Sequence, residues 1–88
     1  MFPEIDARLS KEELAAATKA VDSRLVALGG GAYAGLGFKL KALKAAGFDD
    51  RGPPVSPARL AAYARLARVL NSQGEAATMD SVIAALAA

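Results

Sequence analysis

The sequence predicts an all-α fold, a small domain of four helices. Apolar residues recur at helical spacing in four segments, no segment alternates polar and apolar residues with period two, and capping residues or glycine stops bound the segments. A chain of 88 residues forms one domain, in which we expect residues 1–9 to be an N-terminal arm and residues 49–55 a proline-containing loop. The expected helices lie near residues 10–28, 33–46, 56–71 and 78–87.

The first expected helix has clear signals at both ends. Ser10-Lys11-Glu12-Glu13 fits a capping box, in which the serine and the last glutamate exchange hydrogen bonds with each other's backbone amides. Gly29 follows the last apolar residue and ends the helix, as glycine commonly does. The apolar side chains that share one face of this helix are Leu14, Val21, Leu25 and Leu28.

The segment between the first two helices, residues 29–37, holds five of the chain's eight glycines. Glycine costs about 1 kcal/mol relative to alanine inside a helix. A glycine cluster therefore indicates either a chain reversal or the close approach of another backbone. Gly29–Gly31 fit the turn of an αα-hairpin. Gly35 and Gly37 are not needed for a turn and weaken the first turns of the second helix. Replacing both with alanine is expected to stabilise an isolated hairpin by about 1–2 kcal/mol, unless another backbone lies against them.

The later parts of the chain also carry helix signals. In the second helix, Leu36, Leu40 and Leu43 share a face with Ala32, and Ala46-Gly47-Phe48 fits a Schellman stop. Ser56-Pro57 predicts the start of the third helix, and Thr78 predicts the cap of the fourth. The expected inward side chains of the third helix are Leu60, Tyr63, Ala67 and Leu70, and those of the fourth are Met79, Val82, Ile83 and Leu86.

The composition argues against several kinds of chemistry. The chain has neither cysteine nor histidine, which excludes disulfides, zinc sites built on thiolate or imidazole, and hydrolases with a histidine base. The glycine segment follows a helix rather than a strand and lacks the Gly-Lys-Ser/Thr of a phosphate loop. The acidic pairs are Glu12-Glu13, explained by capping, and Asp49-Asp50, which lacks the pattern of a calcium loop. We therefore expect a non-enzymatic protein without catalytic residues, metal, cofactor or small-molecule substrate.

A protein partner is the leading expectation. Hydrophobic residues make up 53% of the chain, but many are alanines, and aromatic residues are only 6%. Because alanine buries little apolar area, the core of a monomer would be thin, and self-association or docking into a larger assembly would add to it. We expect an interaction module that acts as a homo-oligomer or as a small subunit. Its expected contact residues are Gly31, Gly35, Gly37 and Phe38.

Nucleic acid is the alternative partner. The net charge is only +2, but residues 32–48 carry three lysines and no acid, and residues 56–73 carry three arginines and no acid. If these two helices pack side by side, their cations form a face that could neutralise phosphates. Six cations on one exposed face would favour nucleic acid, whereas scattered cations beside an exposed apolar patch would favour a protein. The residues concerned are Lys39, Lys41, Lys44, Arg59, Arg65 and Arg68.

The sequence also argues against a membrane location. The longest uncharged run, residues 25–38, is shorter than the roughly twenty apolar residues of a membrane span. Residues 35–44 form a cationic amphipathic segment, but they lack tryptophan and spread their lysines around the helix axis, which argues against membrane-surface binding. The N-terminus, with Glu4 and Asp6, has no signal-peptide pattern. Together with the absence of cysteine, this predicts a cytoplasmic protein.

Overall fold

The computed structural model describes residues 2–48 and 56–87 and confirms the all-α fold. Each helix begins and ends within one or two residues of the expected position, and no strand occurs in the described ranges. The expected loop at residues 49–55 lies outside the described residues. The elements in chain order are α1 (Lys11–Leu28), α2 (Ala32–Ala45), α3 (Pro57–Gln73), the 3₁₀ turn η1 (Gly74–Ala76) and α4 (Met79–Ala87).

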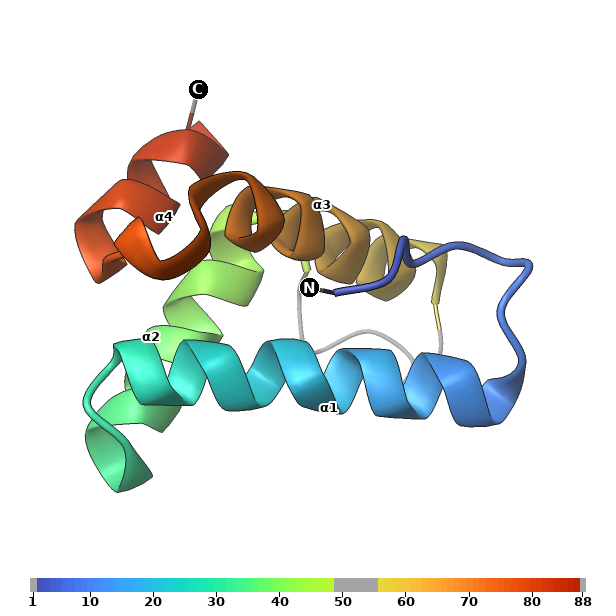
Figure 1. Cartoon of the computed structure of the whole chain (residues 1–88), viewed down its shortest axis with the longest axis horizontal. Helices are drawn as coiled ribbons and strands as arrows, with labels where there is room; N and C mark the ends of the chain where they lie inside the picture. The colour runs from blue at the N-terminus through green and yellow to red at the C-terminus, as the bar shows by residue number, and fades with distance from the viewer. Residues whose placement is uncertain (1, 49–55, 88) are drawn as a thin grey trace.

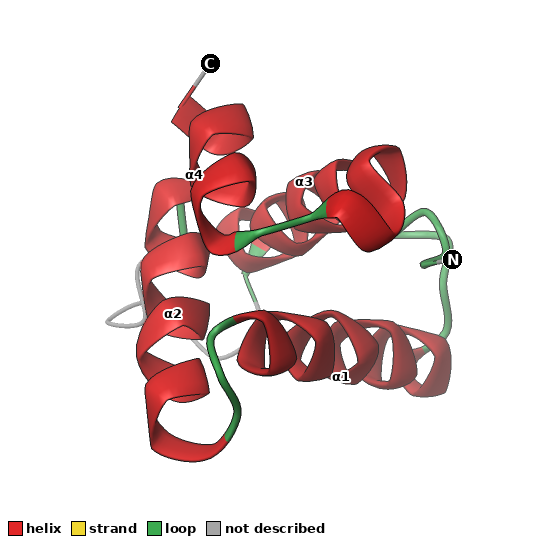
Figure 2. Ribbon diagram, turned by 60° about the vertical axis from the view of Figure 1, so that its left-hand side comes forward, coloured by secondary structure: helices red, strands yellow, loops and turns green. Residues whose placement is uncertain are grey.

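The helices cross rather than form a parallel bundle (Figure 1). α1 and α3 form two levels, α2 runs steeply from one level to the other, and α4 packs beside the upper end of α2 and the end of α3. A second view shows the same steep crossing of α1 and α2 (Figure 2). This differs from the antiparallel hairpin that the glycine-rich turn suggested.

The turn between α1 and α2 needs glycine for two physical reasons. Gly30 and Gly31 have φ angles of 101° and 76°, which side-chain-bearing residues rarely adopt. Gly35 touches the backbone of α1, because a Cβ built there would lie 2.7 Å from Val26 Cγ1 and 2.9 Å from the Val26 carbonyl carbon. Gly29 lies at the same contact, where its own Cβ would come within 2.8 Å of Gly35 Cα. The backbones of α1 and α2 therefore meet with no side chain between them.

This backbone contact decides which face of α2 is buried. α2 turns Gly35 and Phe38 toward α1, so only one of the three leucines that the sequence grouped on a single face is buried. Leu43 is 3% exposed, whereas Leu36 and Leu40 are 47% and 55% exposed. The buried residues of α2 are Gly35, Phe38, Ala42 and Leu43.

The caps that were expected at both ends of the chain are present. The Ser10 amide donates to Glu13 Oε1 (3.0 Å), and the Glu13 amide donates to Ser10 Oγ (3.1 Å). These bonds stabilise the ionised carboxylate and lower the pKa of Glu13, chiefly through the Ser10 backbone amide. At α4 the Ser81 amide donates to Thr78 Oγ1 (3.1 Å).

The expected end of α2 and start of α3 are also confirmed. α2 ends in a Schellman motif, in which the Phe48 amide donates to the Leu43 carbonyl (3.0 Å). At the start of α3, the Ser56 hydroxyl accepts a hydrogen bond from the Arg59 amide (3.1 Å). Local capping chemistry therefore fixes the helix ends that the sequence indicated.

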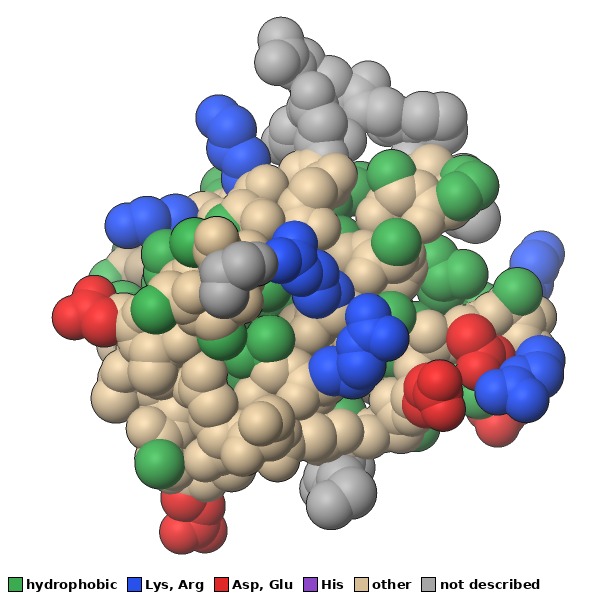
Figure 3. Space-filling model, turned by 90° about the horizontal axis from the view of Figure 1, so that it is seen from above, with side chains coloured by type: hydrophobic (Ala, Val, Ile, Leu, Met, Phe, Trp, Pro, Cys, Tyr) green, Lys and Arg blue, Asp and Glu red, His purple; other side chains and the backbone are tan. Residues whose placement is uncertain are grey.

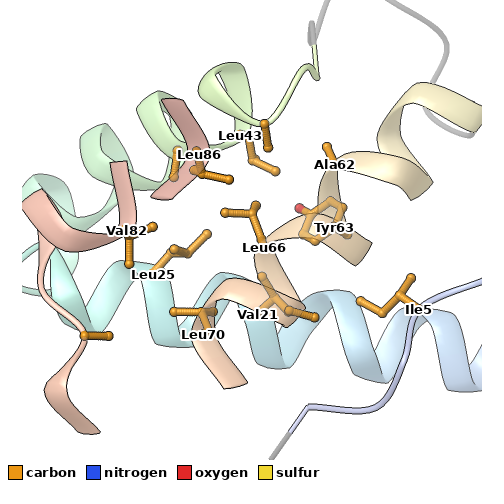
Figure 4. Packing of buried hydrophobic residues seen from close by; sticks show 14 of the residues in the cluster. Ile5, Val21, Leu25, Leu43, Ala62, Tyr63, Leu66, Leu70, Val82 and Leu86 are labelled. Carbon is orange, nitrogen blue, oxygen red and sulfur yellow. The ribbon is translucent and has the colours of Figure 1, made fainter. Parts of the chain in front are cut away.

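The hydrophobic core draws on all four helices and the N-terminal arm (Figure 4). The arm contributes Ile5, which is 3% exposed, and Asn71 of α3 holds the arm in place. Its side-chain amide accepts from the Phe2 amide and donates to the Phe2 carbonyl, both at 2.8 Å. The largest fully buried side chains are Tyr63, Leu25, Leu66, Val21 and Val82.

A polar link crosses three helices beside this core. The Tyr63 hydroxyl of α3 donates to Asp22 Oδ1 of α1 (2.7 Å), and Lys39 Nζ of α2 lies 3.6 Å from Asp22 Oδ2. Burial raises the pKa of Tyr63 to about 12, and the hydrogen bond to Asp22 adds to the effect. The sequence placed Tyr63 on the inward face of its helix correctly, but it carried no local signal for a partner 41 positions away.

Substitutions at the two helical glycines should have opposite effects on stability. Gly35→Ala should destabilise the fold by about 1–3 kcal/mol, since the new methyl group meets the Val26 backbone. Gly37→Ala should stabilise the fold by up to about 1 kcal/mol, since no atom of the described residues lies within 4 Å of the position that the new Cβ would take. Urea unfolding of both variants at low protein concentration measures this difference. Equal changes would show that α2 does not press on α1 at Gly35.

Ionisation of Tyr63 should weaken the fold at high pH. Folding raises the pKa of this phenol from 10.0 to about 12, so its contribution is complete below pH 10 and is lost as the pH rises through 12. In a Tyr33→Phe variant, Tyr63 is the only tyrosine, and ultraviolet absorbance reports its ionisation alone. We expect ionisation near pH 12, coupled to loss of helical circular dichroism. Ionisation near pH 10 with the helices intact would contradict the buried link.

Candidate functional site

The outward face of α2 carries a row of exposed apolar side chains. Tyr33 is 92% exposed, and Leu36 and Leu40 follow at intervals of three and four residues, which places all three on one side of the helix. Gly37 lies among them, with open space where a Cβ would stand, as far as the described residues reach. We call Tyr33, Leu36, Gly37 and Leu40 the α2 stripe.

An open groove between α2 and α4 borders this stripe. The two helices run beside each other at this end of the molecule (Figure 2). Met79 at the start of α4 is 45% exposed, so the apolar surface continues from the α2 stripe across the groove. The groove is lined by Ala34, Gly37, Phe38 and Lys41 of α2 and by Met79, Asp80, Ile83 and Ala84 of α4.

The grouping of these apolar side chains on one face distinguishes them from scattered exposed residues. Single exposed apolar residues are common on monomers, but a contiguous patch bordered by charged residues is typical of an interaction site. The α2 stripe has Lys41 on one side and Lys44 one turn beyond Leu40, both exposed. The surface thus combines an apolar centre with a cationic edge.

The four expected partner-contact residues occupy different environments. Gly35 is buried and Phe38 is 7% exposed, both packed inside the chain. A backbone does lie against Gly35, and it belongs to Val26 of the same chain, so the stabilisation expected from alanine at position 35 is wrong. Gly31 precedes α2 in the turn, whereas Gly37 lies on the outer surface.

The exposed residues Tyr33, Leu36, Leu40 and Met79 were not among the expected contacts, and the expectation that Met79 faces inward is wrong, because Met79 is 45% exposed. Tyr33, Leu36 and Leu40 are spaced three and four residues apart, and this spacing alone would have placed them on one helical face. Leu36 and Leu40 were instead grouped with Leu43 as a buried face, so the exposed row was missed.

Three of the six cations considered for nucleic acid contact the chain itself. Lys39 pairs with Asp22, and its side chain is 25% exposed. The Arg59 guanidinium lies over the ring of Tyr63, with 5.4 Å to the centroid, and 6.0 Å from that of Phe48. Arg65 donates to the Leu86 carbonyl at the end of α4 (2.6 Å).

The other three cations, Lys41, Lys44 and Arg68, are exposed. Figure 3 shows the molecule from above Figure 1, where α3 and α4 lie nearest the viewer. On this face two Lys or Arg side chains lie next to each other near the middle, and apolar atoms and backbone separate the others from them. The visible arrangement is one of scattered cations rather than a continuous basic patch.

Two further features bear on the class of protein. Within residues 2–48 and 56–87, no group of three or more acidic side chains is placed to hold a metal ion. None of the helices in the described part of the chain is long and apolar enough to cross a membrane.

Comparison with protein-family models, curated proteins and solved structures gave no significant match.

Proposed function

We propose that this chain is a non-enzymatic interaction module that docks a helical protein partner on the α2 stripe. It acts either as a homo-oligomer or as a small subunit of a larger assembly. The observation that carries the proposal is the exposure of Tyr33 (92%) on the same helix face as Leu36 and Leu40. The described residues leave the Tyr33 ring almost fully in water beside two leucines. This apolar area is available for a partner to bury.

The free energy available from this surface is in the range that association requires. An aromatic side chain buries roughly 150–250 Å², equivalent to about 4–6 kcal/mol, and each leucine, already about half buried, adds about 0.7–1.7 kcal/mol. Loss of translational and rotational freedom opposes binding by about 4–15 kcal/mol. The α2 stripe therefore accounts for a weak to moderate complex, and contacts to Met79 across the groove would strengthen it.

Gly37 supports a helix as the docking element. Glycine weakens α2 at this position by about 1 kcal/mol relative to alanine, and the described residues place nothing near its Cβ that would require glycine. A glycine in the middle of an apolar helix face allows the backbone of a second helix to approach closely. The same property explains the contact of Gly35 with α1.

Nucleic acid has less support as the partner. Binding through phosphates depends on several cations that are free to meet one surface. Lys39 and Arg65 instead contact groups of their own chain, and Arg59 covers two aromatic rings.

Leu40→Glu should abolish partner binding while leaving the fold intact. The substitution places an unpaired charge in the centre of the stripe, where docking would bury it. The matched control is Ala61→Glu, which adds the same charge at an exposed position of α3. Both variants should keep the wild-type thermal transition, because both positions face solvent.

The measurement combines sedimentation analysis with pull-downs from cells that express the protein, with and without nuclease. We expect Leu40→Glu to lose both self-association and captured proteins, and Ala61→Glu to retain whatever the wild type binds. Capture that survives Leu40→Glu, or that disappears only after nuclease treatment, would contradict the proposal.

A further inference from the structure

We propose that the α2 stripe docks α2 of a second copy of this chain, antiparallel to the first, with Gly37 of both copies at the twofold axis. This inference rests on the proposed function, because it assigns an occupant to the same surface. A symmetric dimer must use one self-complementary patch, in which residue i of one copy contacts residue j of the other and residue j contacts residue i. Parallel and antiparallel pairs of helices can both be twofold symmetric, so the spacing and charges of the α2 stripe have to select the orientation.

The spacing of the stripe is self-complementary about Gly37. Tyr33 precedes this glycine by four residues and Lys41 follows it by four, so an antiparallel pair places Tyr33 of each copy opposite Lys41 of the other. By the same spacing, Leu40 faces Ala34, an exposed small residue in the groove between α2 and α4. A large side chain from each copy therefore enters the space that a small one leaves in the other.

The charges select the antiparallel orientation. The two exposed lysines of α2, Lys41 and Lys44, lie in its C-terminal half, and the N-terminal half carries Tyr33 and no charged residue. A parallel pair would place each lysine opposite itself. An antiparallel pair instead brings Lys41 over the Tyr33 ring, an attractive cation–π arrangement. Asp80 lines the same groove and adds a carboxylate next to the apolar surface.

The extent of the surface predicts a weak dimer. A standard interface buries about 800 Å² per partner, and this chain exposes 5584 Å² in total. α2 has 14 residues and is therefore about 21 Å long, so contacts between the two α2 helices cover less than a standard interface. We expect a dissociation constant in the micromolar range, with monomer and dimer both populated at ordinary working concentrations.

Single-cysteine variants test the orientation directly, since the natural chain has no cysteine. Gly37→Cys places the two sulfurs at the axis of an antiparallel pair, where a disulfide can close. Leu40→Cys can link to itself only in a parallel pair. Ala61→Cys, on an exposed part of α3, measures random collisions. Under mild oxidation at a concentration well above the dissociation constant of the wild type, which offsets the weaker pairing caused by a Cβ at position 37, we expect Gly37→Cys to cross-link at least about tenfold faster than the other two variants.

Two further experiments extend this test, and the first of them leaves Gly37 in place. An equimolar mixture of Tyr33→Cys and Lys41→Cys should give mainly the mixed disulfide, because these positions face each other only between antiparallel copies. Gly37→Ala, which should not destabilise the monomer, should weaken dimerisation by at least about tenfold, because its methyl group separates the two backbones. Sedimentation equilibrium measures that change.

Three results would overturn the antiparallel dimer: fast linkage of Leu40→Cys, no preference for the mixed disulfide, or a wild type that stays monomeric throughout the micromolar range. If the wild type is monomeric but Leu40→Glu still abolishes capture of a different protein, the proposed function holds and this inference fails. If the wild type is monomeric and captures no protein that Leu40→Glu fails to capture, both the proposed function and the antiparallel dimer are contradicted.

Discussion

The contact between Gly35 of α2 and Val26 of α1 sets the arrangement of the domain. A side chain at position 35 would collide with the Val26 backbone, so the two helices meet only because glycine stands there. Gly29 lies at the same point, and with both glycines α2 can cross the end of α1 steeply. This crossing fixes the rotation of α2 about its own axis. Phe38 then enters the core, and Leu36 and Leu40 stay outside.

The rest of the molecule builds on that orientation. α3 and α4 close the core against α1 and the inner face of α2, with alanines at several buried positions. Lys39, on the inner side of α2, reaches Asp22 and joins the link to Tyr63 across three helices. The same rotation that supplies Phe38 and Lys39 to the interior leaves an apolar row on the outside. The fold and the proposed docking surface therefore follow from one backbone contact.

The sequence predicted what local chemistry controls. Helix positions, the Ser10–Glu13 capping box and the Schellman stop at Phe48 depend on neighbouring residues, and all are present. The buried face of α2 was not predicted, because apolar spacing assigns leucines to the core and does not register that a glycine can be the buried residue. The link between Tyr63 and Asp22 had no local signal either. The spacing of the residues in the α2 stripe can be read from the sequence. Their exposure to solvent could not be predicted, because it depends on α1 covering the opposite face of α2.

The rotation of α2 is therefore the claim to measure first. Attenuation of leucine methyl signals by a soluble paramagnetic agent, recorded by NMR at concentrations where the chain is monomeric, reports which side chains face water. Strong attenuation of Leu36 and Leu40, with Leu43 protected as well as the core residue Leu25, is the predicted result. Protection of Leu36 and Leu40 with attenuation of Leu43 would contradict the backbone contact at Gly35 and the docking surface that depends on it.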